Sequence, residues 1–170
     1  MDDKTWLGAL AEAKVVAALL EARCEVFTPV TGKSPFDLIA VRDGEMIRVE
    51  VKGCASRTKG GGFAVQLRSV RPNRTVNRVR HLDAARSDLL AVYLAPLDAV
   101  CFFPTASLHG RAGITLHVER RGPQKARQHL VAEYAMLPQG AVAEWTKATA
   151  LKVVDPQGSV GSNPTRSADG

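Results

Sequence analysis

The chain has 170 residues, of which 45% are hydrophobic, and a formal net charge of +6, so it is long enough for one domain with its own core. Its apolar runs are shorter than the roughly twenty residues of a membrane span and its first residues are acidic, so we expect a cytoplasmic protein without signal peptide or membrane contact. Three widely spaced cysteines predict buried, reduced thiols rather than a disulfide framework, and the four histidines lack the spacing of a zinc site.

A helix is predicted for residues 3–23, because apolar residues recur there at three-to-four spacing. Glu12 lies in the same stripe as Val15 and Leu19, so its carboxylate is expected to point toward the body of the protein. The alternative is a solvated glutamate at the margin of the stripe.

Strand-like runs follow at 25–30, 36–41 and 46–51, and the Asp43-Gly44 pair between the last two predicts a tight hairpin. The later predicted elements are a flexible basic loop at 53–62, a strand at 62–70, a basic segment of loop and short helix at 71–87, two buried strands within 88–108 joined by a turn at Leu97-Asp98, an edge strand at 113–120 and a closing helix at 125–137.

Three charged residues lie at the ends of these apolar runs. Strand alternation places Glu50 and Lys52 on one face, and an antiparallel hairpin brings Asp37 near them. Two carboxylates with few other donors suit Mg²⁺ or Mn²⁺ better than zinc. A lysine beside such a metal can orient or deprotonate a water for attack on a phosphodiester. The alternative is structural: Asp37 opens its strand in a turn, and Glu50 and Lys52 form an ordinary cross-strand ion pair.

Basic residues concentrate between residues 57 and 86, where Asp83 is the only acid. Such a cluster can neutralise phosphates, although a solvated basic face is the alternative. The residues expected to contact DNA phosphates are Arg57, Lys59, Arg68, Arg71 and Arg74.

The order of Glu12, the segment Pro35-Phe36-Asp37 and the tripeptide Glu50-Val51-Lys52 resembles the PD-(D/E)XK nuclease superfamily. Two later segments resemble its branch of intron-encoded homing endonucleases and resolvase-like enzymes. They are DLLAVYLAPLDAVCFFP at 88–104 and QKARQHLVAEY at 124–134. Many members of this branch have glutamine where this chain has Glu50, and the proline stands two residues before Asp37 instead of one.

The resemblance implies an α/β fold with a mixed central sheet flanked by helices, as in restriction endonucleases. It implies that Asp37 and Glu50 bind Mg²⁺, with Mn²⁺ as a substitute, and that the Val51 carbonyl is a further ligand. Lys52 would assist the attacking water, and Glu12 would complete or support the metal site.

The activity that the resemblance implies is Mg²⁺-dependent cleavage of double-stranded DNA by a homing or mobile-element endonuclease. The alternatives are a Holliday-junction-resolvase-like nuclease and a DNA-binding remnant that does not cleave. Because a single-site enzyme normally needs two copies to cut both strands, we expect at least a homodimer. No small-molecule cofactor is expected.

The nuclease domain is predicted to span residues 1–137, and residues 138–170 are predicted to be a disordered tail because their apolar residues follow no period. The tail's AVAEWTKA and GSNPT segments resemble a translated tRNA gene. Synonymous codons for the tail permit paired acceptor, anticodon and T arms with an anticodon for leucine. Our hypothesis is that the reading frame continues into a tRNA-Leu gene, and sequencing of the locus tests it.

Overall fold

The computed structural model describes residues 3–31, 34–71, 78–80, 82–120 and 128–137. Its helices and strands are, in chain order, α1 (Asp3–Glu21), β1 (Glu25–Phe27), β2 (Leu38–Arg42), β3 (Glu45–Cys54), β4 (Phe63–Gln66), β5 (Ser69–Arg71), β6 (Arg78–Arg80), β7 (Leu89–Leu94), β8 (Ala99–Pro104), β9 (Gly113–His117), β10 (His129–Leu130) and α2 (Val131–Tyr134). Short 3-10 turns at Ala95–Leu97 and Thr105–Leu108 follow β7 and β8.

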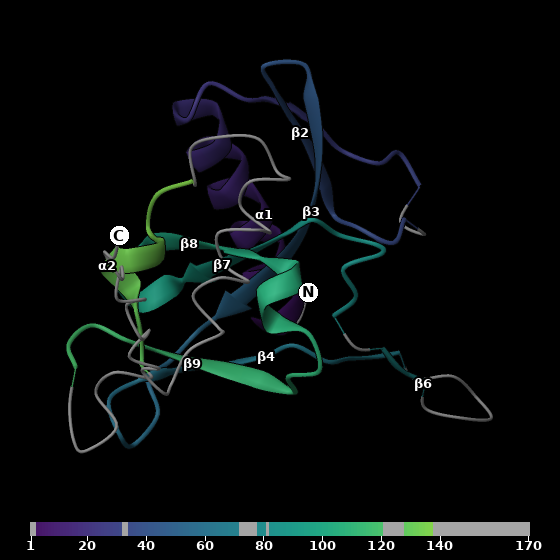
Figure 1. The fold of residues 1–170 in the computed structure, drawn as a ribbon. Helices are drawn as coiled ribbons and strands as arrows, with labels where there is room; N and C mark the ends of the chain where they lie inside the picture. Colours follow the sequence, from purple (N-terminus) through teal and green to yellow (C-terminus); the bar gives the residue numbers. More distant parts are fainter. Residues whose placement is uncertain (1–2, 32–33, 72–77, 81, 121–127, 138–170) are drawn as a thin grey trace, which may run out of the picture.

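The central sheet has the strand order β1-β2-β3-β7-β8 (Figure 1). Strands β3 and β7 pair in parallel, and the other neighbours in this sheet are antiparallel. The predicted mixed sheet in an α/β fold is therefore confirmed.

The hairpin between β2 and β3 sets the register on which the site depends. Asp43 and Gly44 have φ angles of 53° and 80°, the left-handed conformation at both turn positions that a two-residue type I′ hairpin requires. This turn pairs Leu38 with Val49, and Asp37, one residue before β2, bonds through its amide to the Val49 carbonyl. The hairpin prediction is confirmed.

Each face of the central sheet is covered by a different layer. Helix α1 packs on one face, and a smaller sheet of order β10-β9-β4 covers the other. In Figure 1, α1 lies on one side of β7 and β8 while β4 and β9 lie on the other. All six residues of β7 are buried, and they alternate between the two core clusters. The strand therefore contributes to both sides of the core.

Two predicted elements are corrected. The basic segment at 71–87 was expected to be loop and short helix, but Arg78–Arg80 is strand β6, which pairs antiparallel with β5. The closing helix at 125–137 is reduced to Val131–Tyr134, because His129 and Leu130 pair with β9 as strand β10. Residues 72–77 and 125–127 lie outside the described residues.

The three cysteines are free and buried, as predicted. Among the described residues, no helix has the length and apolar character needed to cross a membrane. The predicted tail at 138–170 lies outside the described residues, so the domain boundary and the tRNA hypothesis stay predictions.

Candidate active site

Asp37 is fixed against β3 by its backbone and by its side chain. Its amide nitrogen donates to the Val49 carbonyl oxygen over 2.9 Å, and its carboxylate Oδ2 accepts the Val51 amide over 2.7 Å. Because the N–H and C=O of one strand residue point to the same side, the Val51 carbonyl also faces the edge where Asp37 lies. Two hydrogen bonds therefore hold Asp37, which stands just before β2, against the Val49–Val51 stretch of β3.

Glu50 and Lys52 form an ion pair on one face of β3. The Lys52 Nζ donates to Glu50 Oε1 over 2.6 Å, and the two side chains are 21% and 19% exposed, respectively. Their strand neighbours on β7 are Leu90 and Val92, which belong to the core between the two sheets. An ion pair of Glu50 with Lys52 is thus present, as the structural alternative expects, but it lies within a single strand and not across two, and it is half-buried.

The expectation that Glu12 points into the body of the protein is wrong. Its side chain is exposed, at the margin of a stripe that buries Ala11, Val15 and Leu19. Partial burial nevertheless raises the pKa of the Glu12 carboxyl, and the negative charge of Asp37 raises it further. Glu12 and Asp37 therefore lie close enough to repel one another.

Across the ranges that the structure describes, no three His, Cys, Asp or Glu side chains gather to hold a metal ion. The physical reason is that α1, with Glu12, packs on the face of the sheet opposite to Glu50. The structure thus bonds Asp37 to Val51, the neighbour of Glu50 in β3, and places it near Glu12, without gathering the three carboxylates at one point.

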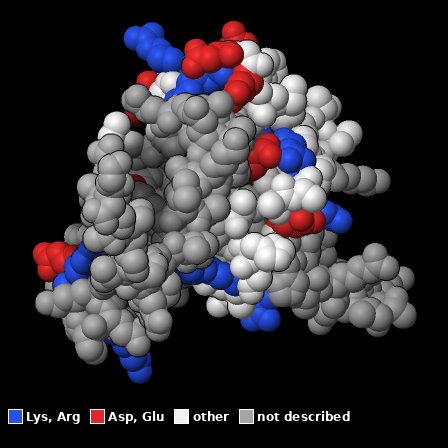
Figure 2. All heavy atoms as spheres, viewed as in Figure 1, with Lys and Arg blue, Asp and Glu red and all other residues white. Residues whose placement is uncertain are grey.

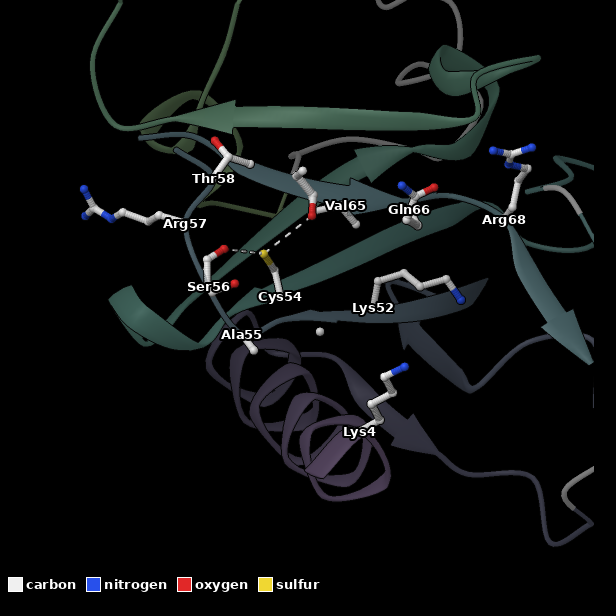
Figure 3. Close-up of a pocket in the computed structure, with 12 residues that line it drawn as sticks. Lys4, Lys52, Cys54, Ala55, Ser56, Arg57, Thr58, Val65, Gln66 and Arg68 are labelled. Carbon is white, nitrogen blue, oxygen red and sulfur yellow. Dashed lines mark hydrogen bonds between the residues drawn. The ribbon is translucent and has the colours of Figure 1, made fainter. Parts of the chain in front are cut away.

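A pocket of about 790 Å³ opens beside Lys52 (Figure 3). It is formed by the first turn of α1, the end of β3, the following loop, and β4 with the residues after it. Its polar lining includes Lys4, Lys52, Arg57, Gln66 and Arg68. The pocket is basic, because four of its lining residues are Lys or Arg and its lining, among the residues that the structure describes, includes no acid.

The predicted DNA-contacting residues take different positions. Arg57 and Arg68 line the pocket, and the Arg57 guanidinium lies 5.1 Å from the centre of the Phe63 ring. Lys59 is exposed in the loop before β4, and Arg71 ends β5. Arg74 lies outside the described residues.

Sequence reasoning missed Lys4 and Gln66, which reach the pocket from α1 and from the end of β4. A lysine in a first helical turn and a glutamine at a strand end are ordinary surface residues in a sequence, so no local pattern distinguishes them.

It also missed a supporting ion pair. Asp88, at the start of β7, accepts hydrogen bonds from the Arg48 amide at 2.8 Å, Nε at 3.0 Å and a terminal guanidinium nitrogen at 2.7 Å. Burial alone would raise the pKa of Asp88, but these bonds and the positive charge of Arg48 outweigh it and lower the pKa below its ordinary value. These hydrogen bonds hold the start of β7 against β3 at Arg48, two residues before Glu50.

A family model described as PD-(D/E)XK endonuclease matches residues 1–137. The chain therefore belongs to the PD-(D/E)XK endonuclease family and is a nuclease.

Among solved structures, the chain is similar to a bacterial homing endonuclease, I-Ssp6803I. The TM-score is 0.66 at 18% sequence identity, and the match covers 92% of this chain and 100% of that one. At this identity the similarity establishes the fold. No curated protein matches the chain.

Proposed function

We propose that the protein is a Mg²⁺-dependent DNA endonuclease of the homing or mobile-element type, with Mn²⁺ as a possible substitute. The observation that carries the proposal is the hydrogen bond that holds the Asp37 carboxylate at Val51, between Glu50 and Lys52, which bond to each other, in a chain of the PD-(D/E)XK endonuclease family. Family membership favours the catalytic interpretation of this ion pair over the structural one.

The residues that would hold the cation are Asp37, Glu50 and the Val51 carbonyl. Two carboxylates and a carbonyl leave room for the several waters that Mg²⁺ retains. The raised pKa of Glu12 beside Asp37 supports the fit, because a cation would relieve the repulsion between these carboxylates. When bound, the metal would supply Lewis acidity and lower the pKa of a bound water. Glu12 would support the site from its margin.

Lys52 would act on the reacting groups directly. Its ammonium has three N–H donors, one of which binds Glu50 Oε1. The others can orient an attacking water or donate to a non-bridging oxygen of the scissile phosphate. Glu50 keeps the ammonium in place through the 2.6 Å bond, so the lysine is positioned before substrate arrives.

Duplex DNA is the substrate that the basic residues favour. Arg57 and Arg68 lie at the pocket and Lys59 lies on its exposed loop. Arg71 belongs to the two-stranded β5–β6 ribbon, and the part of the chain carrying β6 projects away from the body in Figure 1. Such a ribbon is a shape that the major groove of B-DNA admits. Arg74, between its strands, is retained in this proposal from the sequence.

On the face drawn in Figure 2, basic and acidic side chains are interspersed among the residues that are coloured. On this face, individual basic residues and not a uniformly basic surface would therefore direct DNA to the site.

Cutting both strands implies at least a homodimer. The solvent face of α1 supports self-association, because Trp6, Leu10 and Leu20 are 65%, 37% and 54% exposed at helical spacing. Sedimentation velocity of the protein gives the oligomeric state directly.

The function is tested by incubating the full chain with Mg²⁺ and two substrates: a plasmid carrying the protein's own genomic neighbourhood, and a four-way DNA junction. We expect wild type to cut the plasmid at discrete sites. The cleavage rate of Lys52→Met should be at least about a hundredfold lower, since methionine keeps the stem length but removes the charge. Junction cutting without plasmid cutting would instead favour the resolvase-like alternative. Binding without cutting of either would favour the remnant, and titration with Mg²⁺ by calorimetry would then show no difference between wild type and Asp37→Ala.

A further inference from the structure

The basic pocket beside Lys52 brings together side chains that are far apart in the sequence. Lys4 comes from the first turn of α1, Lys52 from β3, and Gln66 and Arg68 from the end of β4 and just beyond it. Figure 3 shows Lys4 and Lys52 extending toward the same end of the pocket, with Gln66 and Arg68 on its opposite wall. Arg57 extends from the other end.

A close contact between α1 and β3 makes this arrangement possible. Gly53 has no side chain, and a Cβ built there would lie only 2.8 Å from Leu7 Cγ and 3.4 Å from Ala11 Cβ. Helix α1 therefore approaches the end of β3 more closely than a residue with a side chain would allow. Lys4, almost one turn before Leu7, consequently reaches the pocket at the strand's end.

Among the described residues, Lys52 of the pocket is paired with Glu50, but two other cations of the pocket are not balanced in this way. Lys14, on the same helix as Lys4, pairs with Asp98 over 2.7 Å. In contrast, within the described part of the chain neither Lys4 nor Arg68 forms an ion pair, and the pocket lining contains no acid. Cations facing one space repel each other unless an anion enters. An anion with several oxygens would also accept from the Gln66 amide N–H.

The pocket is larger than a single phosphate needs. Its volume of about 790 Å³ lies within the range of sites that hold whole small molecules, so a sugar-phosphate unit can enter. Lys52 belongs both to this pocket and to the Glu50 ion pair. A DNA strand lying across Lys52 would therefore place one phosphate at the Glu50–Lys52 pair. The neighbouring phosphate of that DNA strand would then lie between Lys4 and Arg68.

We propose that Lys4, Gln66 and Arg68 bind the phosphodiester next to the one that is cut, with Lys4 as a substrate-positioning residue. This inference rests on the proposed nuclease function and deepens it. Lys4 contacts the DNA backbone beside the cut and not the reacting atoms, so its removal should weaken DNA binding more than it slows the chemical step.

The test compares Lys4→Ala with Lys14→Ala, a matched control on the same helix whose lysine lies outside the pocket lining. Binding of a fluorescent duplex by the full chain is measured with EDTA over a series of salt concentrations. We expect Lys4→Ala to weaken binding about tenfold at 0.1 M salt and to lower the slope of log K against log salt by about one. Lys14→Ala should leave the slope unchanged.

Two further measurements locate the contact. Duplexes with a single uncharged methylphosphonate should bind wild type more weakly at one position beside the cut, and Lys4→Ala should be insensitive at that position. In cleavage, Lys4→Ala should raise KM with kcat nearly unchanged.

Equal salt slopes for Lys4→Ala and Lys14→Ala, with wild type binding and cutting normally, would overturn this inference and leave the proposed function standing. Failure of wild type to bind duplex at all would overturn both. Thermal unfolding of each variant confirms that it is folded.

Discussion

Asp37 has a structural contact and a proposed metal-binding role, which a pair of substitutions separates. Its carboxylate accepts the Val51 amide over 2.7 Å, which is a structural bond, and its charge is proposed to hold the metal. Asp37→Asn keeps an oxygen acceptor for Val51 and removes the charge. Asp37→Ala removes both. We therefore expect both variants to lose cleavage, but only the alanine variant to lose appreciable stability.

The size of the stability difference follows from the bond. A hydrogen bond to a charged acceptor contributes roughly 1.5–3 kcal/mol, and a strand N–H left without an acceptor carries a similar desolvation cost. We expect Asp37→Ala to destabilise the fold by about 2 kcal/mol. The stability of Asp37→Asn should stay within about 1 kcal/mol of wild type, because two effects oppose each other. The amide oxygen is a weaker acceptor than the carboxylate, but the repulsion between residue 37 and Glu12 is removed.

Urea denaturation without metal gives the two stabilities, and plasmid cleavage with Mg²⁺ gives the two activities. Asp43→Asn, in the exposed hairpin turn, is the matched control. Asparagine also tolerates the left-handed conformation, so both quantities should equal wild type. Equal stabilities for Asp37→Ala and Asp37→Asn would refute the structural role, and cutting by Asp37→Asn at the wild-type rate would refute the metal role.

Three further variants test the surroundings of the site. Because the pKa of Glu12 is raised in the folded state, its contribution to stability is present at low pH and is lost as pH rises through that pKa. Without metal, the melting temperature of Glu12→Gln should therefore be higher than that of wild type at pH 7 and equal to it at pH 4. Added Mg²⁺ should reduce the difference in melting temperature at pH 7. A variant that melts below wild type at pH 7 would contradict this. The lowered pKa of Asp88 has the opposite sign, with stability present at neutral pH and lost in acid. Asp88→Asn should cost about 1–2 kcal/mol at pH 7 after allowing for the partial exposure of the Arg48 pair, and less at pH 3, as urea titrations at both pH values would show. Gly53→Ala should destabilise by about 1–3 kcal/mol through the clash of its Cβ with α1, and an unchanged urea midpoint would show that the helix can shift at little cost.

Local patterns were sufficient for much of the fold. The helical period located α1 to within two residues of its end, and the Asp43-Gly44 pair located the hairpin. Alternation in β3 correctly put Glu50 and Lys52 on one face. These features depend on periods of 3.6 and 2 and on turn conformation, which neighbouring residues specify by themselves.

The exposure of Glu12 depended on tertiary packing. Its periodicity fits both the buried stripe and its margin, and only the docking of α1 on the sheet decided between them. The ends of the basic segment and of the closing helix were likewise decided by distant partners, since β6 forms against β5 and β10 against β9. Strand pairing draws a segment into a ladder when a free edge is available, whatever its local helical preference.

The sequence by itself indicated a candidate constellation: Asp37 and the Glu50-Val51-Lys52 tripeptide flank one tight turn, and the structure bonds the Asp37 carboxylate to the Val51 amide. Tertiary structure decided what surrounds that constellation. Lys4 and Gln66 reach Lys52 because α1 approaches β3 at Gly53 and because β4 covers the opposite face. Contacts made through a turn are fixed by a few backbone angles, whereas contacts between separate elements depend on how the whole core packs.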